Sequence, residues 1–195
     1  AISPNKLTMI QDRVKEAVQY TEKKYKEMFC IASDEYKLLE ADGKLLSLPF
    51  DQNTFTLKYK FSTPQEWIDE LCSVSNSDAQ KRYPFLYVNS MRIDQKDDII
   101  EIGEIVIATL SKSSWKTTQR DEYTFRPVLN ILYDMFIRGC KVSRQFSLID
   151  KGTRKDHYFY GRLGLYGGEA NKFSDYVDAI EINNLKLRLY KKCYD

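Results

Sequence analysis

The run from Ile99 to Leu110 constrains the fold of this chain more than any other stretch, because it is apolar on both faces of a strand. Side chains alternate between the two faces of a β-strand, so a strand that is apolar on both sides needs cover on both. We expect a helix on one face, and another helix, a second sheet or another subunit on the other. One predicted face carries Ile100, Ile102, Glu104, Val106, Ala108 and Leu110, and the other carries Glu101, Gly103, Ile105, Ile107 and Thr109.

Two amphipathic segments could supply helical cover for this strand. Residues 3–30 place apolar side chains at helical spacing, with Ser3 as a candidate N-cap and Pro4 at the first helical position. Residues 117–138 repeat the pattern, with Thr117 or Thr118 as the cap and Gly139 as the end. Pro127 should kink this second helix or mark a second start.

Further strands are predicted from alternating or β-rich stretches at residues 54–61, 84–91, 141–149, 156–166 and 176–190. Two short strands could flank a turn at residues 41–44, and residues 62–72 carry helix-start signals. Residues 150–153 indicate a hairpin turn. Ile180 and Ile182 share one parity and Leu185 and Leu187 the other, so we expect a bulge or a break at Asn183–Asn184.

This order of elements predicts an α+β fold, with a mainly antiparallel sheet packed against the long N-terminal helix and the central helix. The chain has 195 residues, which suits a single domain over 1–195. Residues 31–80 read as a small inserted αβ segment, an added subdomain beside a core of about 3–30 and 81–195.

Charge and hydropathy exclude several classes of protein. There are 30 Lys and Arg against 28 Asp and Glu, and a net charge of +2 is too small for a general nucleic-acid binder. The first ten residues lack a basic start followed by an apolar run, and no stretch reaches the roughly 20 apolar residues of a membrane span. We expect no secretion signal and no membrane.

Catalytic candidates are few. The single His157 excludes sites that need two or three His ligands, and the four Cys show no metal-binding spacing, which predicts reduced thiols. A nucleophilic Cys140 paired with His157 is the sharper alternative, but the end of a helix raises the pKa of a thiol. Glu101 and Glu104 flank the best strand without the nearby Lys of a metal-dependent nuclease. We predict no catalytic residue, no metal and no cofactor.

The 14 Tyr are unusual, because Tyr is favoured where protein surfaces meet. Tyr158, Tyr160 and Tyr166 share a parity on the strand predicted at 156–166, opposite its apolar side. A subunit contact would also cover the second face of the strand at 99–110. The predicted interface therefore consists of Ile105, Ile107, Tyr158, Tyr160 and Tyr166.

The segment from Tyr83 to Phe146 carries a Pro-aromatic strand start at Tyr83-Pro84-Phe85, a charged turn at 94–98, an apolar strand ending in IATLS and a helix opening on RDE. In this order the elements resemble the neck or head–tail connector ring proteins of tailed bacteriophages, of the tail-terminator or tail-completion type. The style of the sequence suits the crAss-like phages. The resemblance extends to the closing strands and the N-terminal helix, and it covers about two-thirds of the chain.

The resemblance implies a virion structural protein without catalytic residues, which forms a six-fold or twelve-fold ring with copies of itself. Its partners would be the portal or other neck rings, the tail proteins, and the genomic DNA that passes through the channel without specific binding. It would be assembled in the cytoplasm of the bacterial host and located in the neck or tail of the virion. The alternatives are an intracellular adaptor module, or a small metal-dependent enzyme acting on nucleic acid through Glu101 or Glu104.

Overall fold

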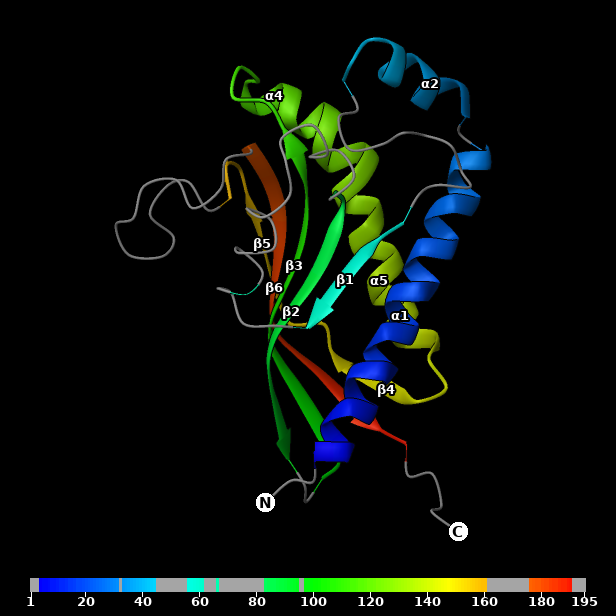
Figure 1. The fold of residues 1–195 in the computed structure, drawn as a ribbon, viewed down its shortest axis with the longest axis vertical. Helices are drawn as coiled ribbons and strands as arrows, with labels where there is room; N and C mark the ends of the chain where they lie inside the picture. The colour runs from blue at the N-terminus through cyan, green and yellow to red at the C-terminus, as the bar shows by residue number, and fades with distance from the viewer. Residues whose placement is uncertain are drawn as a thin grey trace, which may run out of the picture.

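The protein has an α+β fold in which helices cover one face of a six-stranded, mostly antiparallel sheet (Figure 1), which confirms the predicted fold class. The computed structural model describes residues 4–31, 33–44, 56–61, 66, 83–94, 97–160 and 176–190. Its elements are α1 (Pro4–Ile31), α2 (Ser33–Ala41), β1 (Lys58–Phe61), β2 (Phe85–Asp94), β3 (Ile99–Ser111), α4 (Thr117–Arg120), the π-helix η2 (Asp121–Leu129), α5 (Asn130–Val142), β4 (Phe146–Asp150), β5 (Thr153–His157) and β6 (Tyr176–Leu189).

The strands lie in the order β1-β2-β3-β6-β4, and β5 also pairs with β6. Among the strands that the structure describes, only β1 and β2 are parallel. Because β4 and β5 follow one another along β6, they form one interrupted edge strand. The hairpin predicted at residues 150–153 is therefore wrong. Its Gly152 has a φ of 71°, and a bulge uses the same left-handed glycine as a tight turn.

One continuous helix runs from α4 through η2 to α5. Its N-cap is Lys116, whose backbone N–H donates to Gln119 Oε1 at 2.9 Å, so neither predicted threonine is the cap. Pro127 lies within η2 and does not start a second helix. Proline lacks an N–H and crowds the preceding turn, and the wider π-helix accommodates it.

Gly139 lies inside α5 and does not end it. A Cβ at this position would lie 3.0 Å from the Ala17 carbonyl oxygen and 3.1 Å from the Tyr20 ring. The glycine therefore lets α5 approach α1 closely. In a sequence, a glycine with this packing role looks the same as a glycine that ends a helix.

The segment predicted as an insertion adds to the main sheet. Residues 33–41 form α2 where a strand was predicted before the turn, and Gly43 follows it with a φ of 64°. β1 then pairs with β2, and the side chain of Leu57 is buried in the main core. The helix predicted at 62–72 lies outside the described residues except for Glu66, and residues 161–166 of a predicted strand lie outside them entirely.

A line of irregular positions, here called the crease, crosses the sheet. The register of the flanking residues places Ser90 of β2 opposite Gly103 of β3, and Gly103 opposite Asn184 of β6. Ser90 and Asn184 have φ values of 54° and 60°, and Gly152 of the edge strand continues the line beside β6. A left-handed residue inside a strand reverses the alternation of the side chains beyond it.

The crease corrects the predicted faces of the strand at 99–110. Ile100 and Ile102 lie on one side of it and Ile105 and Ile107 on the other, and all four belong to the main core against the helices. The irregularity expected at Asn183–Asn184 is confirmed, and β6 continues through it as a single strand.

Both faces of β3 are buried beyond the crease, as its composition predicts. The main core lies between the sheet and the helices, where the Tyr25 hydroxyl of α1 donates to the Pro127 carbonyl oxygen at 2.9 Å. A second cluster lies on the opposite, outer face of the sheet. Its buried members are Tyr83, Phe85, Tyr87, Val106, Ala108, Tyr160, Val177 and Ala179.

Candidate functional site

Two predicted interface residues, Ile105 and Ile107, lie in the main core and are fully buried by the chain itself. The prediction assigned them to a face opposite Ile100 and Ile102. The crease places both pairs on the helix side of β3, so neither residue offers a surface to another subunit.

Tyr158 and Tyr160 do not share a face. β5 ends at His157, and Phe159 between the two tyrosines has a φ of 55°, which breaks the alternation. Tyr158 packs against the main core and donates a hydrogen bond to Asp121 Oδ1 at 2.7 Å, which together with burial raises its pKa to about 12. Tyr160 is buried in the second cluster. Tyr166, the last predicted interface residue, lies outside the described residues.

Arg120 and Asp178 form a buried ion pair that the sequence reading missed. Arg120 also donates to Ser111 Oγ at 2.5 Å, to the Lys112 carbonyl oxygen at 2.6 Å and to the Trp115 carbonyl oxygen at 3.1 Å. The RDE motif at the helix start marked Arg120, but a single charge in a sequence does not identify a partner 58 positions away.

Asp178 is equally well satisfied. It accepts hydrogen bonds from the Thr124 hydroxyl at 2.9 Å and from the Phe159 backbone N–H at 3.3 Å. The Phe159 ring lies 3.6 Å from the Arg120 guanidinium carbon. With four guanidinium hydrogen bonds and both carboxylate oxygens of Asp178 engaged, this cluster joins β3, α4, η2, β6 and the bend after β5, and we interpret it as structural.

Cys140 and His157 lie on opposite sides of the sheet. Cys140 is buried in the main core, and burial raises the pKa of its thiol to about 12. The pKa is therefore raised, as predicted, and the cause is desolvation. His157 pairs with Ala179, a member of the outer cluster, and its Nε2 lies 2.7 Å from Glu181 Oε2. Cys140 and His157 therefore do not form a nucleophile–base pair.

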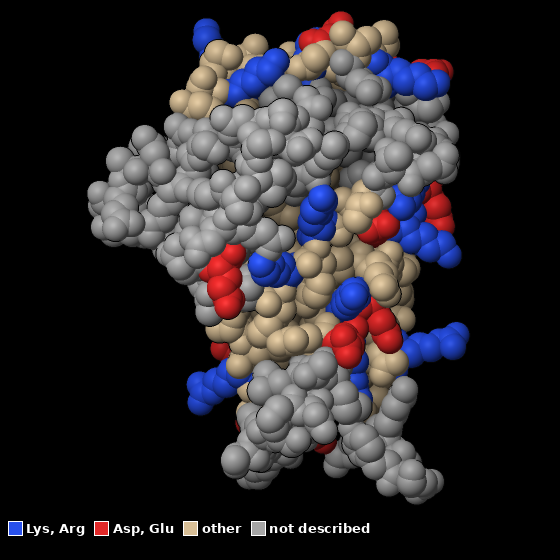
Figure 2. All heavy atoms as spheres, viewed as in Figure 1, with Lys and Arg blue, Asp and Glu red and all other residues tan. Residues whose placement is uncertain are grey.

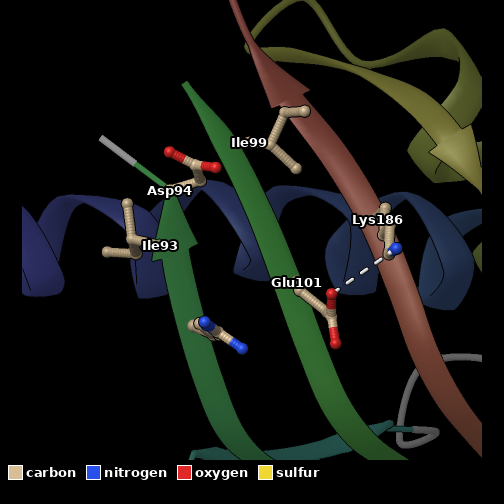
Figure 3. A pocket seen from close by; sticks show the side chains of 6 residues that line it. Ile93, Asp94, Ile99, Glu101 and Lys186 are labelled. Atoms are coloured by element: carbon tan, nitrogen blue, oxygen red, sulfur yellow. Dashed lines mark ion pairs between the residues drawn. The ribbon is translucent and has the colours of Figure 1, made fainter. Parts of the chain in front are cut away.

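Glu101 and Glu104 both face outward, because the crease lies between them. Glu101 lies 3.6 Å from Lys186 Nζ, while Glu104 accepts a hydrogen bond from Asn89 Nδ2 at 3.1 Å. Figure 3 shows Glu101 and Lys186 pointing toward one another across a hollow of about 420 Å³ at this end of the sheet. Among the described residues, no three His, Cys, Asp or Glu side chains are grouped so that they could hold a metal ion.

Four large apolar side chains of the described residues are exposed. Leu38, which is 69% exposed, belongs to α2, and α2 lies near one end of the long axis in Figure 1. Val142 ends α5 and Tyr190 follows β6, which runs toward the other end, and they are 55% and 48% exposed, while Ile149 of β4 is 45% exposed. The Tyr190 backbone N–H donates to the Gln145 carbonyl oxygen at 3.1 Å, which holds Tyr190 beside the turn that follows Val142. No sequence pattern marked these residues, because their exposure depends on the packing of their elements.

No protein-family model, curated protein or solved structure matches this chain significantly. Of the helices that the structure describes, none combines the length and the apolar character needed to cross a membrane.

Proposed function

We propose that this chain is a structural subunit that assembles with copies of itself into a ring in the neck or tail of a tailed bacteriophage. The ring would join the portal or capsid to the tail and surround the channel for the genomic DNA. The role is one of assembly, without a catalytic step, a metal or a cofactor. The order of elements from Tyr83 to Phe146, which suggested this family from the sequence, is one support for the proposal.

The observation that carries the proposal is the pair of exposed apolar sites at opposite ends of the molecule. We call Leu38 on α2 the upper patch, and Val142 with Tyr190 the lower patch. A head-to-tail contact between identical subunits needs two different patches that complement one another, and such contacts close into rings when the rotation between subunits allows it. Burial of such side chains also supplies the main driving force for association.

The charge balance is consistent with a channel wall. A net charge of +2 gives little long-range attraction for phosphate groups, so DNA could move past the ring without being held. The hollow in Figure 3 is lined by charges of both signs, Arg92 and Asp94 as well as the Glu101–Lys186 pair, which fits the same description.

Mass photometry and negative-stain electron microscopy of the purified chain test this proposal. We expect closed particles with a central hole at micromolar concentration, with masses that correspond to six or twelve copies. A protein that remains monomeric over the whole concentration range would contradict it.

A further inference from the structure

A groove of about 750 Å³ lies between α1 and β1, and the ring proposed above makes no use of it. Figure 1 shows β1 between β2 and α1, so the groove follows the edge of the sheet. Its apolar part consists of Val18 and Leu57, which are buried, and Tyr59 and Phe61, which are half-buried. Such a groove can take an apolar side chain beside a polypeptide backbone.

β1 is the edge strand on this side of the sheet, and among the described strands it pairs only with β2. An edge strand presents backbone N–H and C=O groups to an added strand. Just before β1, the Leu57 N–H already donates to a carboxylate oxygen, Glu22 Oε2 of α1, at 3.1 Å. This contact ties α1 to the entry of the strand and shows that an oxygen acceptor can reach the edge backbone there.

The Tyr59 hydroxyl is the second observation that points to a ligand. Its oxygen is buried, and it has no hydrogen-bond partner among the described residues. Burial raises the pKa of Tyr59, and the negative charge of Asp12 adds to the effect, so the hydroxyl keeps its proton and can donate it. A buried hydroxyl without a partner is unfavourable, and a backbone carbonyl in the groove would satisfy it.

The charges around the groove favour an acidic occupant. Lys15, Lys58 and Lys60 line it together with the carboxylate of Asp12. The other carboxylate, Glu22, is engaged by Lys26 at 3.0 Å and by the Leu57 N–H. Figure 2 shows the same face, with charged side chains around uncharged surface. Lys15 and Lys58 therefore outnumber the remaining carboxylate of the lining, Asp12.

We propose that this groove binds an extended, acidic segment of another protein, which adds a strand to the sheet at β1. Its backbone would pair with the edge of β1, an apolar side chain would contact Tyr59 and Phe61, and its carboxylates would lie near Lys15 and Lys58. A second copy of this chain is a poorer occupant, because Lys155 on the opposite sheet edge would meet these lysines, while Arg154 there is already paired with Asp156 at 2.7 Å. The inference does not depend on ring formation.

Fluorescence anisotropy with labelled (Glu-Val)₅ and (Lys-Val)₅ peptides tests the proposal. We expect the acidic peptide to bind the wild-type chain and the basic peptide to bind at least tenfold more weakly. The Lys15→Glu/Lys58→Glu variant should lose at least tenfold in affinity for the acidic peptide. The Lys23→Glu/Lys37→Glu variant makes the same change of net charge away from the groove and should bind like the wild type. Absence of binding to the wild type, or an equal loss in both variants, would overturn the proposal.

Two further measurements separate strand addition from simple charge attraction. Hydrogen exchange should slow at residues 57–61 when the acidic peptide binds, and the Tyr59→Phe variant should bind several-fold more weakly while remaining folded. Unchanged exchange at β1 would overturn the strand pairing. Dimers of the wild-type chain alone that disappear in Lys15→Glu/Lys58→Glu would show that a second copy is the occupant, and would overturn the choice of another protein.

Discussion

Arg120 and Asp178 are both almost completely buried, and the free energy of each charge depends on the other. Transfer of a lone charge from water into a protein interior is costly, and this cost is offset here by the ion pair and by hydrogen bonds to every side of the guanidinium. The pair therefore acts as one unit, and removal of one partner leaves the other uncompensated.

We expect Arg120→Met to lower the free energy of unfolding by about 3 to 5 kcal/mol, because Asp178 would remain buried without its countercharge. Urea unfolding followed by circular dichroism measures the change. The control is Lys186→Met, which breaks the half-exposed pair with Glu101 and should cost less than about 1 kcal/mol. Equal effects of the two substitutions would contradict the assigned role of Arg120.

Cys140 should make stability depend on pH in the alkaline range. Its pKa is raised from 9.0 to about 12 in the folded chain, so the native state keeps a proton that the unfolded state loses. The stabilising contribution is complete below pH 9 and is lost as the pH rises toward 12, by up to about 1.4 kcal/mol per pH unit. Urea unfolding between pH 8 and pH 11 should give a shallower decline for Cys140→Ala than for the wild type. Parallel declines would show that the thiol does not ionise on unfolding.

The sequence predicts a raised pKa for Cys140 from its place near the end of a helix. The structure gives the same direction, and burial of the thiol is its cause. The Arg120–Asp178 pair could not be predicted, because its members are joined only after β3, α4 and β6 have packed. The fates of Tyr158 and Tyr160 depended on the single left-handed residue between them.

At the scale of elements, the strands and helices could be predicted largely from periodicity, and their irregularities could not. α1, β3 and β6 follow long apolar patterns and lie where those patterns predict. In β6 the sequence shows the crease, because the apolar side chains change from even to odd positions. In β3 it does not, because Gly103 fits a regular alternation of the two faces. The faces of β3 could be assigned only from the pairing of β3 with β2 and β6.

The crease makes a prediction about Gly103. A Cβ at this position would lie 2.3 Å from Ser90 Oγ, so that hydroxyl must leave its rotamer, and Gly103→Ala should destabilise the chain by roughly 0.5 to 1.5 kcal/mol. Ser90→Gly removes that oxygen and suits the φ of 54°, so the Ser90→Gly/Gly103→Ala double variant should recover most of the loss. Thermal and urea unfolding of the two single variants and the double variant give the coupling energy.

Gly152 provides the contrast for this test. A Cβ there would lie 2.2 Å from the Asn183 carbonyl oxygen, which is backbone, and the φ is 71°. Gly152→Ala should therefore destabilise the chain in a way that Ser90→Gly does not restore. Additive effects of Ser90→Gly and Gly103→Ala would contradict the direct contact between these two positions.

At the scale of the whole molecule, the exposed large apolar side chains of the described residues are Leu38 on α2, Val142 at the end of α5, Ile149 on β4 and Tyr190 after β6. The sequence predicted an interface on the strands, because β3 is apolar on both faces. The structure buries both of these faces within the chain beyond the crease, so among the described residues the exposed large apolar side chains lie on α2, on β4 and at the ends of α5 and β6.

A mixing experiment tests whether the upper and lower patches meet head to tail. Leu38→Asp removes the upper patch, and Val142→Asp places a charge in the lower patch beside Tyr190, so each variant alone should remain monomeric in mass photometry. An equimolar mixture should form dimers and nothing larger, since each variant keeps one intact and complementary patch. Circular dichroism confirms that both variants fold. Rings formed by either variant alone would show that its patch is not part of the contact.

The crease also has a consequence for how distant relatives of this chain could be recognised. A sequence profile in which apolar and polar positions alternate strictly along each strand fits only the first half of β2, β3 and β6. Beyond the crease, it assigns each residue to the wrong face of the sheet. A profile with one skipped position per strand, placed at Ser90, Gly103 and Asn184, keeps both halves in phase. The skipped positions would have to occur together, because a phase change in one strand alone would set its second half against its neighbours.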